Sequence, residues 1–229
     1  MADYLLVGAV SNAINMPSLT AEDAPRLRPY MRLAEQLGSF AGQLTETGLE
    51  AVVIEYEGHV AELNTRPLTA VLLQGLLSPL LDTVNMVNAP MLARERDITV
   101  SEVKIDGPCD YQTLIRLTAK TERRERIVAG TLFGGTRARV VQVQDIHFEA
   151  ELGRHMLFVR NRDKPGFIGK LGSILGSAGV NIANFHLGRS ANGGSAIALV
   201  EIDGAAPEAA LEAVRAIPDV IQAKALNFY

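Results

Sequence analysis

The sequence predicts an α+β protein in two parts, the second of which is a small βαββαβ unit. Three observations predict this class. Helix-type and strand-type hydrophobic patterns are mixed before residue 100, and a run of short strand patterns follows them. Residues 155–229 then alternate regularly between strand and helix patterns. A chain of 229 residues is also long enough for two domains with separate cores.

Composition excludes several classes of function. With 22 basic and 26 acidic residues, the chain is mildly acidic, so we expect no general electrostatic binding to nucleic acid or to an anionic membrane. The longest apolar run, residues 68–81, is too short to span a bilayer, and no basic segment precedes the apolar residues near the N-terminus. The single cysteine, Cys109, cannot form an internal disulfide, which indicates a reducing compartment, the cytoplasm.

The first part is expected to begin with helices. Residues 1–11 have a helical pattern but are too short to be stable alone. Thr20 is a predicted N-cap for a second helical stretch, which Pro25 and Pro29 are expected to divide into a short helix and a longer one that ends near Gly48. One apolar stripe runs along this stretch: Leu27, Tyr30, Ala34, Leu37, Ala41 and Leu44.

Strands are expected to dominate the rest of this part. The β-branched residues of 51–56 predict a strand, and residues 60–63 are its expected partner across Gly58. Helices are predicted at 67–83 and 91–96. Further strands are predicted to begin at residue 98 and to cover 111–121, 126–133, 139–143 and 147–152.

The six segments of the second part are well marked. They are predicted at 155–161, 166–178, 181–189, 195–202, 207–216 and 220–227. The first helix follows Pro165 and has a helical stripe, after which Gly179 is expected in the left-handed conformation that often ends a helix. The stripe consists of Phe167, Ile168, Leu171, Ile174, Leu175 and Ala178. Four glycines at helical spacing are expected to allow close packing against a sheet or a partner helix: Gly166, Gly169, Gly172 and Gly176.

Small polar residues flank this helix. Asn161 and Asp163 lie on the loop that enters it, and Asn181 lies on the loop that leaves it. Such groups suit an amino acid, because carboxylate or amide oxygens bind an ammonium group, and an amide or a helix N-terminus binds a carboxylate. Asn and Asp beside Pro and Gly are also typical turn formers, so the pattern alone leaves both interpretations open.

The whole second part resembles an ACT domain, a small amino-acid-sensing module. The resemblance covers all six segments and includes the motifs Asp163-Lys164-Pro165-Gly166 and Gly179-Val180-Asn181-Ile182. It implies a ferredoxin-like fold. It also implies that Asn161, Asp163 and Asn181 hold an effector at an interface between two paired modules.

Other stretches, in order along the chain, resemble the long-form D-3-phosphoglycerate dehydrogenase family. They are residues 9–17, 28–38, 87–90 and 130–134. The resemblance implies a remnant of the helix that leaves the catalytic part at 1–16, an intervening, allosteric substrate-binding domain at 17–151 and an ACT domain at 152–229, with a hinge at 152–154. It implies L-serine or a similar small amino acid as effector. The expected protein partners are a second copy, through the ACT domain, and the catalytic domains of the parent enzyme.

The catalytic half of that family has no counterpart here. The sequence lacks the Gly-x-Gly-x-x-Gly cofactor turn that follows a first strand in a dinucleotide-binding fold. We therefore expect a regulatory fragment that is not an enzyme by itself. We expect no cofactor in this chain, because NAD would bind to the catalytic domains of the parent enzyme.

Arg137, Arg139 and His147 are a candidate anion site on neighbouring strands. Alternating arginines on a strand usually form a solvated face, which is the other interpretation of this pattern. Four scattered histidines show no metal-ligand spacing, and we expect no metal site: His59, His147, His155 and His186.

Two alternative functions remain. The small (beta) subunit of an iron–sulfur L-serine dehydratase has a similar arrangement, but that family carries a Gly-Pro-Ser-Ser-Ser-His stretch near its start, where this chain has residues 15–20 without the serine run or the histidine. The other alternative is a free-standing ACT module that forms oligomers.

Overall fold

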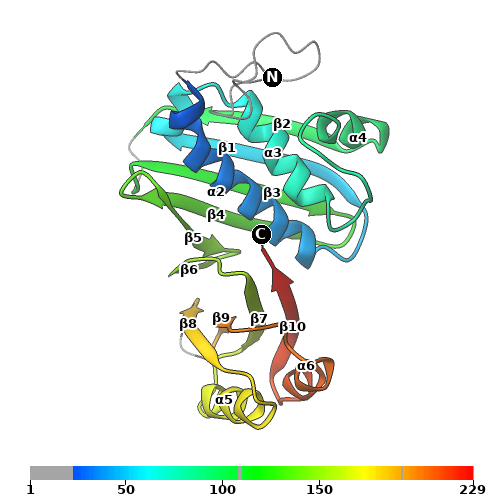
Figure 1. Cartoon of the computed structure of the whole chain (residues 1–229), viewed down its shortest axis with the longest axis vertical. Helices are drawn as coiled ribbons and strands as arrows, with labels where there is room; N and C mark the ends of the chain where they lie inside the picture. The colour runs from blue at the N-terminus through cyan, green and yellow to red at the C-terminus, as the bar shows by residue number, and fades with distance from the viewer. Residues whose placement is uncertain (1–22, 108–109, 192, 229) are drawn as a thin grey trace. The chain divides into compact units, whose positions relative to one another are not determined.

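A computed structural model describes residues 23–107, 110–191 and 193–228. The chain divides into two compact units, Met1–Val140 and Val141–Tyr229. Both contain helices and strands, so the predicted α+β class is confirmed (Figure 1). The predicted helix at 1–11, the segment 1–16 and Cys109 lie outside the described residues.

The larger sheet has six strands in the order β2-β1-β3-β4-β5-β6. β1 pairs in parallel with β2 and antiparallel with β3, and β3 pairs antiparallel with β4. The strands are β1 (Leu49–Gly58), β2 (Thr99–Ile105), β3 (Thr113–Thr121), β4 (Glu125–Phe133), β5 (Arg137–Val143) and β6 (Ile146–Ala150).

Helix α2 (Asp23–Leu44) buries the whole predicted apolar stripe, together with Leu33 and Phe40. The prediction that prolines divide this stretch is wrong, because α2 is one helix of 22 residues. Pro25 lies in the first turn, where its missing N–H removes no intrahelical hydrogen bond. Pro29 does remove one, and burial of the long apolar face offsets that loss.

Helix α3 (Arg66–Leu77) packs closely against α2. A methyl group on Gly38 or Gly42 of α2 would run into the carbonyl oxygens of Leu72 or Leu76 of α3. The predicted extension of α3 to residue 83 is wrong. Pro79 follows soon after the end at Leu77, and its ring has no N–H for the next intrahelical bond. Helix α4 (Ala89–Glu95) follows.

The strand predicted at residues 60–63 is also wrong. A 3₁₀ helix, η1 (His59–Glu62), occupies this position. The chain turns at Gly58, whose φ is +69°, and the backbone N–H of His59 then donates to the carbonyl oxygen of Gln112 at 3.0 Å. Val60 is buried by this turn. The true neighbours of β1 are β2 and β3, both far along the chain.

The second unit contains a four-stranded sheet in the order β10-β7-β9-β8, so β8 and β10 are its edges. All six predicted segments are confirmed: β7 (His155–Arg162), α5 (Phe167–Ser177), β8 (Ile182–Arg189), β9 (Ser195–Ile202), α6 (Glu208–Arg215) and β10 (Val220–Asn227). Leu157 and Val159 of β7 pack in one core with Leu171 of α5 and Val214 of α6. These residues place both helices on the same face of the sheet.

The glycines at the start and end of α5 adopt the left-handed region, with φ of +90° at Gly166 and +71° at Gly179. The predicted close packing of the glycines inside α5 against a sheet is wrong for the described part of this chain, whereas packing against a partner helix of another copy stays a prediction. A Cβ added to Gly169, Gly172 or Gly176 would meet nothing there within 4 Å. The helix is held instead by Phe167, Leu171 and Leu175, while Ile168 of the predicted stripe is 52% exposed.

Gly153 lies in the segment that joins β6 to β7. A methyl group at this position would run into the carboxylate of Glu201 on β9. That carboxylate also accepts a 2.5 Å hydrogen bond from Nδ2 of Asn184 on the edge strand β8. The backbone at Gly153 therefore fits closely against a side chain that is itself fixed to the edge of the sheet.

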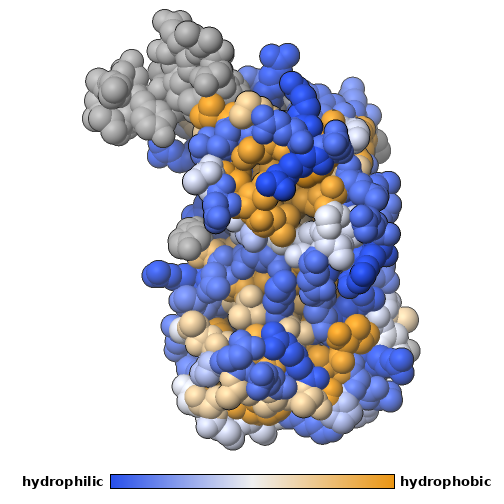
Figure 2. Space-filling model, turned by 90° about the vertical axis from the view of Figure 1, so that its right-hand side faces the viewer, coloured by the Kyte–Doolittle hydropathy of each residue, from blue (hydrophilic) through white to orange (hydrophobic). Residues whose placement is uncertain are grey.

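The surface is predominantly hydrophilic in the view of Figure 2, where hydrophobic side chains form one larger patch in the upper part of the view and smaller patches lower down. Within the described ranges, no helix combines the length and the apolar character needed to cross a membrane.

Candidate functional site

Two of the predicted effector residues lie at one end of the second sheet, on the face covered by α5 and α6. Asn161 follows Leu157 and Val159 at two-residue spacing, so its side chain points to the same face as theirs. In the neighbouring strand Asn161 is opposite Ala196, and Ala196 is in turn opposite Arg189 of β8. The Cα atoms of Asn161 and Arg189 therefore lie on either side of a small, buried alanine. They are about 9.5 Å apart, which is twice the distance between neighbouring strands.

Asn161 has an unusual environment for an amide. The residue is only 2% exposed, and its Nδ2 donates a 2.7 Å hydrogen bond to the carbonyl oxygen of Arg162. Its Oδ1 is buried without a hydrogen-bond partner among the residues that the structure describes. The opposite amide orientation would set two oxygens against each other. A buried acceptor without a donor is rare and costs about 1–3 kcal/mol. A donor that reached Oδ1 would remove this cost.

Asp163 follows the end of β7. Its backbone N–H donates to the carbonyl oxygen of Gly194 at 2.8 Å, which ties it to the hairpin between β8 and β9. Its carboxylate Oδ2 lies 3.4 Å from Nη1 of Arg189. A carboxylate and a guanidinium thus lie side by side on the surface, and the carboxylate is two residues along the chain from the buried amide of Asn161.

Arg189 is absent from the residues predicted from sequence. The signal for it lies in the strand register, because Arg189 ends β8 and faces Ala196 across the hairpin. A strand pattern gives the alternation of faces but not which residues of two strands stand opposite each other.

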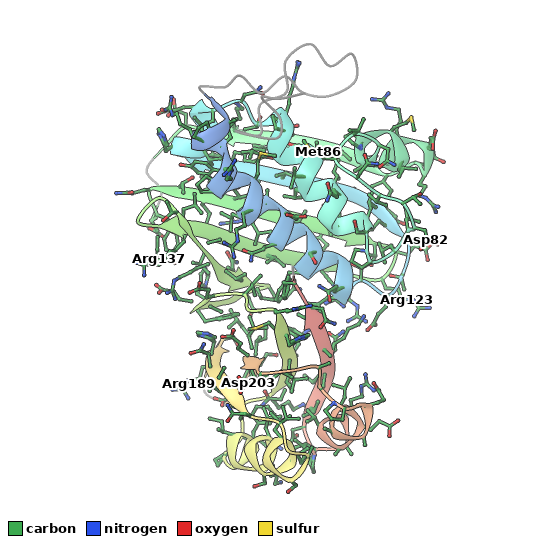
Figure 3. All side chains as sticks on the ribbon, in the orientation of Figure 1. Asp82, Met86, Arg123, Arg137, Arg189 and Asp203 are labelled. Atoms are coloured by element: carbon green, nitrogen blue, oxygen red, sulfur yellow. The ribbon has the colours of Figure 1, made fainter. Side chains whose placement is uncertain are left out.

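Asn181 lies at the other end of β8. Its Nδ2 donates a 2.7 Å hydrogen bond to Oδ2 of Asp203, just after β9 (Asp203 and Arg189 are labelled in Figure 3). Eight residue steps separate Asn181 from Arg189, and an extended strand covers about 25 Å over that distance. A single module therefore brings Asn161 and Asp163 together but keeps Asn181 too far away to touch the same small ligand.

A groove of about 610 Å³ lies between α5 and α6. It is lined mainly by small and apolar residues, with Lys170 as its charged member. The groove does not include Asn161, Asp163 or Asn181. It offers little polar chemistry for holding an amino acid.

The candidate anion residues lie on β5 and β6. Arg137 and Arg139 share one face of β5 by strand alternation, and Arg137 is labelled in Figure 3. The guanidinium of Arg139 lies over the ring of Phe133, 5.3 Å from its centre. His147 is an exposed residue of β6. An anion site at these three residues stays a prediction.

The described ranges contain no group of three or more His, Cys, Asp or Glu side chains that could hold a metal ion.

The fold defines a two-part protein of the α+β class, in which a βαββαβ module follows a larger mixed domain. Residues 26–144 match the family model of the D-3-phosphoglycerate dehydrogenase intervening domain, and residues 155–219 match that of the ACT domain. The chain belongs to the D-3-phosphoglycerate dehydrogenase family and corresponds to its regulatory part, as the sequence motifs predict.

Curated relatives agree with this assignment. The chain is 36% identical over 220 residues to D-3-phosphoglycerate dehydrogenase from Synechocystis sp., covering 95% of this chain and 40% of the relative. It is 31% identical to the enzymes of that name from Bacillus subtilis and Methanocaldococcus jannaschii, with 95% and 94% of this chain and 42% and 41% of the relatives covered. The chain thus spans about two fifths of the length of these relatives.

Proposed function

We propose that this chain is the amino-acid-sensing regulatory part of a D-3-phosphoglycerate dehydrogenase and that its effector is L-serine or a similarly small amino acid. One observation carries the proposal. The Oδ1 of Asn161 is buried without a hydrogen-bond partner among the described residues, and Asp163, two residues further along the chain, carries a carboxylate. Two oxygen acceptors of this kind suit an ammonium group. The match to the ACT domain, a module that typically binds amino acids, supports the same conclusion.

The complete site needs two copies of the chain. β8 is an edge strand of its sheet, and a second strand can extend a sheet at such an edge. If two β8 strands pair antiparallel about a two-fold axis, the start of one strand lies beside the end of the other. Asn181 of one copy then approaches Asn161 and Asp163 of its partner. This arrangement explains why Asn181 lies so far from the other two residues within a single module.

The remaining features of the proposal concern the parent enzyme. The oxidation step and NAD belong to catalytic domains outside this chain, and the protein acts in the cytoplasm. The intervening domain extends over 17–151 and the ACT domain over 152–229, with the hinge between them. The names of the relatives favour this proposal over the iron–sulfur L-serine dehydratase subunit.

Calorimetric titration with L-serine, combined with light scattering, tests the proposal. We expect L-serine to bind with one site per chain and to increase the dimer fraction at low protein concentration, because a ligand that binds only the paired form stabilises pairing. A chain that binds no small amino acid would refute the sensing function. That result, with dimers still present, would instead favour a free-standing oligomerising module.

A further inference from the structure

The proposed function leaves one feature unexplained, which is the positively charged side chain of Arg189 beside the predicted effector-binding residues. Arg189 ends the edge strand β8, and its Nη1 lies 3.4 Å from Oδ2 of Asp163. Asp163 follows the end of β7, and the β8–β9 hairpin holds the backbones of both residues. Arg189 pairs with Ala196 along this hairpin, and the backbone N–H of Asp163 donates to Gly194 within it.

The ion pair contributes little to stability. The side chain of Arg189 is 60% exposed and that of Asp163 is 24% exposed, and the 3.4 Å separation is long for a charge-assisted hydrogen bond. Exposed pairs of this kind contribute at most about 1 kcal/mol. The hairpin has other supports, since the backbone N–H of Ser190 donates to the carbonyl oxygen of Ser195 at 3.0 Å. The stability of the module therefore does not explain why a guanidinium is present at this position.

The other cations near the site are oriented elsewhere. Lys164, beside Asp163, forms an ion pair with Asp219 at 3.2 Å. Lys170 lines the groove between α5 and α6. Arg162 is the next residue after Asn161 and so points to the opposite face of the sheet. Arg189 is the cation that shares a face and a cross-strand row with Asn161.

We propose that Arg189 binds the α-carboxylate of the effector, while Asp163 and Asn161 bind its ammonium group. The inference rests on the proposed amino-acid sensing and adds the residue that recognises the second charge. In the ligand-free chain the two charged side chains pair with each other. When a zwitterion binds, its carboxylate contacts Arg189 and its ammonium group contacts Asp163, so each of the four charges still has a partner. A ligand that lacks the carboxylate occupies Asp163 but gives Arg189 no anion.

The test combines a change in the protein with a matching change in the ligand. Binding of L-serine and of L-serinamide, whose carboxylate is replaced by a neutral amide, is measured by calorimetry for the wild-type chain and for Arg189→Gln. We expect Arg189→Gln to weaken L-serine binding at least about tenfold, the low end for a lost charge-assisted hydrogen bond. L-serinamide binding should not weaken, because this ligand makes no contact with Arg189. Arg189→Lys should recover part of the lost affinity, because it keeps the charge but not the planar fork.

Arg215→Gln is the matched control. Arg215 forms an exposed ion pair with Glu208 on α6, so this variant removes the same charge from the same module away from the site. Its affinities for both ligands should equal those of the wild-type chain, and thermal melting should show all variants folded.

Each outcome distinguishes the two proposals. If wild-type and Arg189→Gln chains bind L-serine equally, Arg189 does not bind the carboxylate, but amino-acid sensing stands. An equal loss for both ligands shows a structural role for Arg189 and also overturns the inference. If the wild-type chain binds no L-serinamide, recovery by Arg189→Lys becomes the deciding measurement. If the wild-type chain binds no L-serine, both proposals fail.

Discussion

A complementation experiment tests directly whether one effector site is built from two copies of the chain. The variants Asp163→Ala and Asn181→Ala each remove one polar contact. A charge-assisted hydrogen bond contributes about 1.5–3 kcal/mol, so each variant alone should bind L-serine at least about tenfold more weakly. Both variants should melt like the wild-type chain, because Asp163 is bonded to the hairpin through its backbone and Asn181 is exposed.

The fraction of sites that regain wild-type affinity after mixing follows from the geometry. About 25 Å of strand separates Asn181 from Arg189, the neighbour of Asp163, so a shared site takes these residues from different copies. In a mixed dimer one site receives both intact residues and the other site receives both substitutions. After exchange of an equimolar mixture, half of the dimers are mixed, and about a quarter of all sites should regain wild-type affinity.

Calorimetry of the mixture, compared with each variant alone, measures the recovered sites. Two different affinity tags report whether subunits have exchanged. If tagged chains co-purify as mixed dimers and no tight site appears, the site does not draw on two copies, and the argument from the β8 edge is refuted.

Three further predictions concern stability. Gly42→Ala should lower the free energy of unfolding in urea by about 1–3 kcal/mol, because its methyl group overlaps the backbone of α3. Gly172→Ala on the open face of α5 should not destabilise the protein, and equal effects of the two variants would refute the packing argument. Tyr56→Phe should cost about 1–2 kcal/mol in the same assay, because it removes a buried 2.8 Å hydrogen bond to a threonine hydroxyl; an unchanged midpoint would count against that bond. Gly153→Ala should lower the melting temperature, and adding Glu201→Ala should restore part of it by removing the carboxylate in contact; purely additive losses would show that the two positions are not coupled.

The second unit could be predicted almost entirely from the sequence because its signals are local. Each helix and strand there is bounded by residues that stop it, such as Gly179, which does adopt the left-handed conformation that the pattern predicts. The apolar stripe of α2 was equally clear, but the effect of Pro29 was not. Whether a proline breaks a helix depends on how much buried surface the helix gains elsewhere, and this is set by tertiary packing.

The misassigned partner of β1 has a different cause. The strand nearest in sequence was the natural candidate, but Ala51 pairs with Thr99 on one side and Lys120 on the other. Such pairings depend on the whole fold. The same limit applies to Arg189, because its approach to Asp163 follows from a cross-strand register that a single sequence does not reveal.

The three glycines inside α5 have a consequence for motion. Each costs a helix about 1 kcal/mol relative to alanine, and no packing within the described chain compensates for it. Helix α5 should therefore open more readily than its neighbours, and its amide hydrogens should exchange with solvent faster than those of the central strands. Because α5 begins just after Asn161 and Asp163, an effector bound there would slow this exchange. Part of the response to the effector would then be a decrease in the opening of α5, which a static structure of either state would miss.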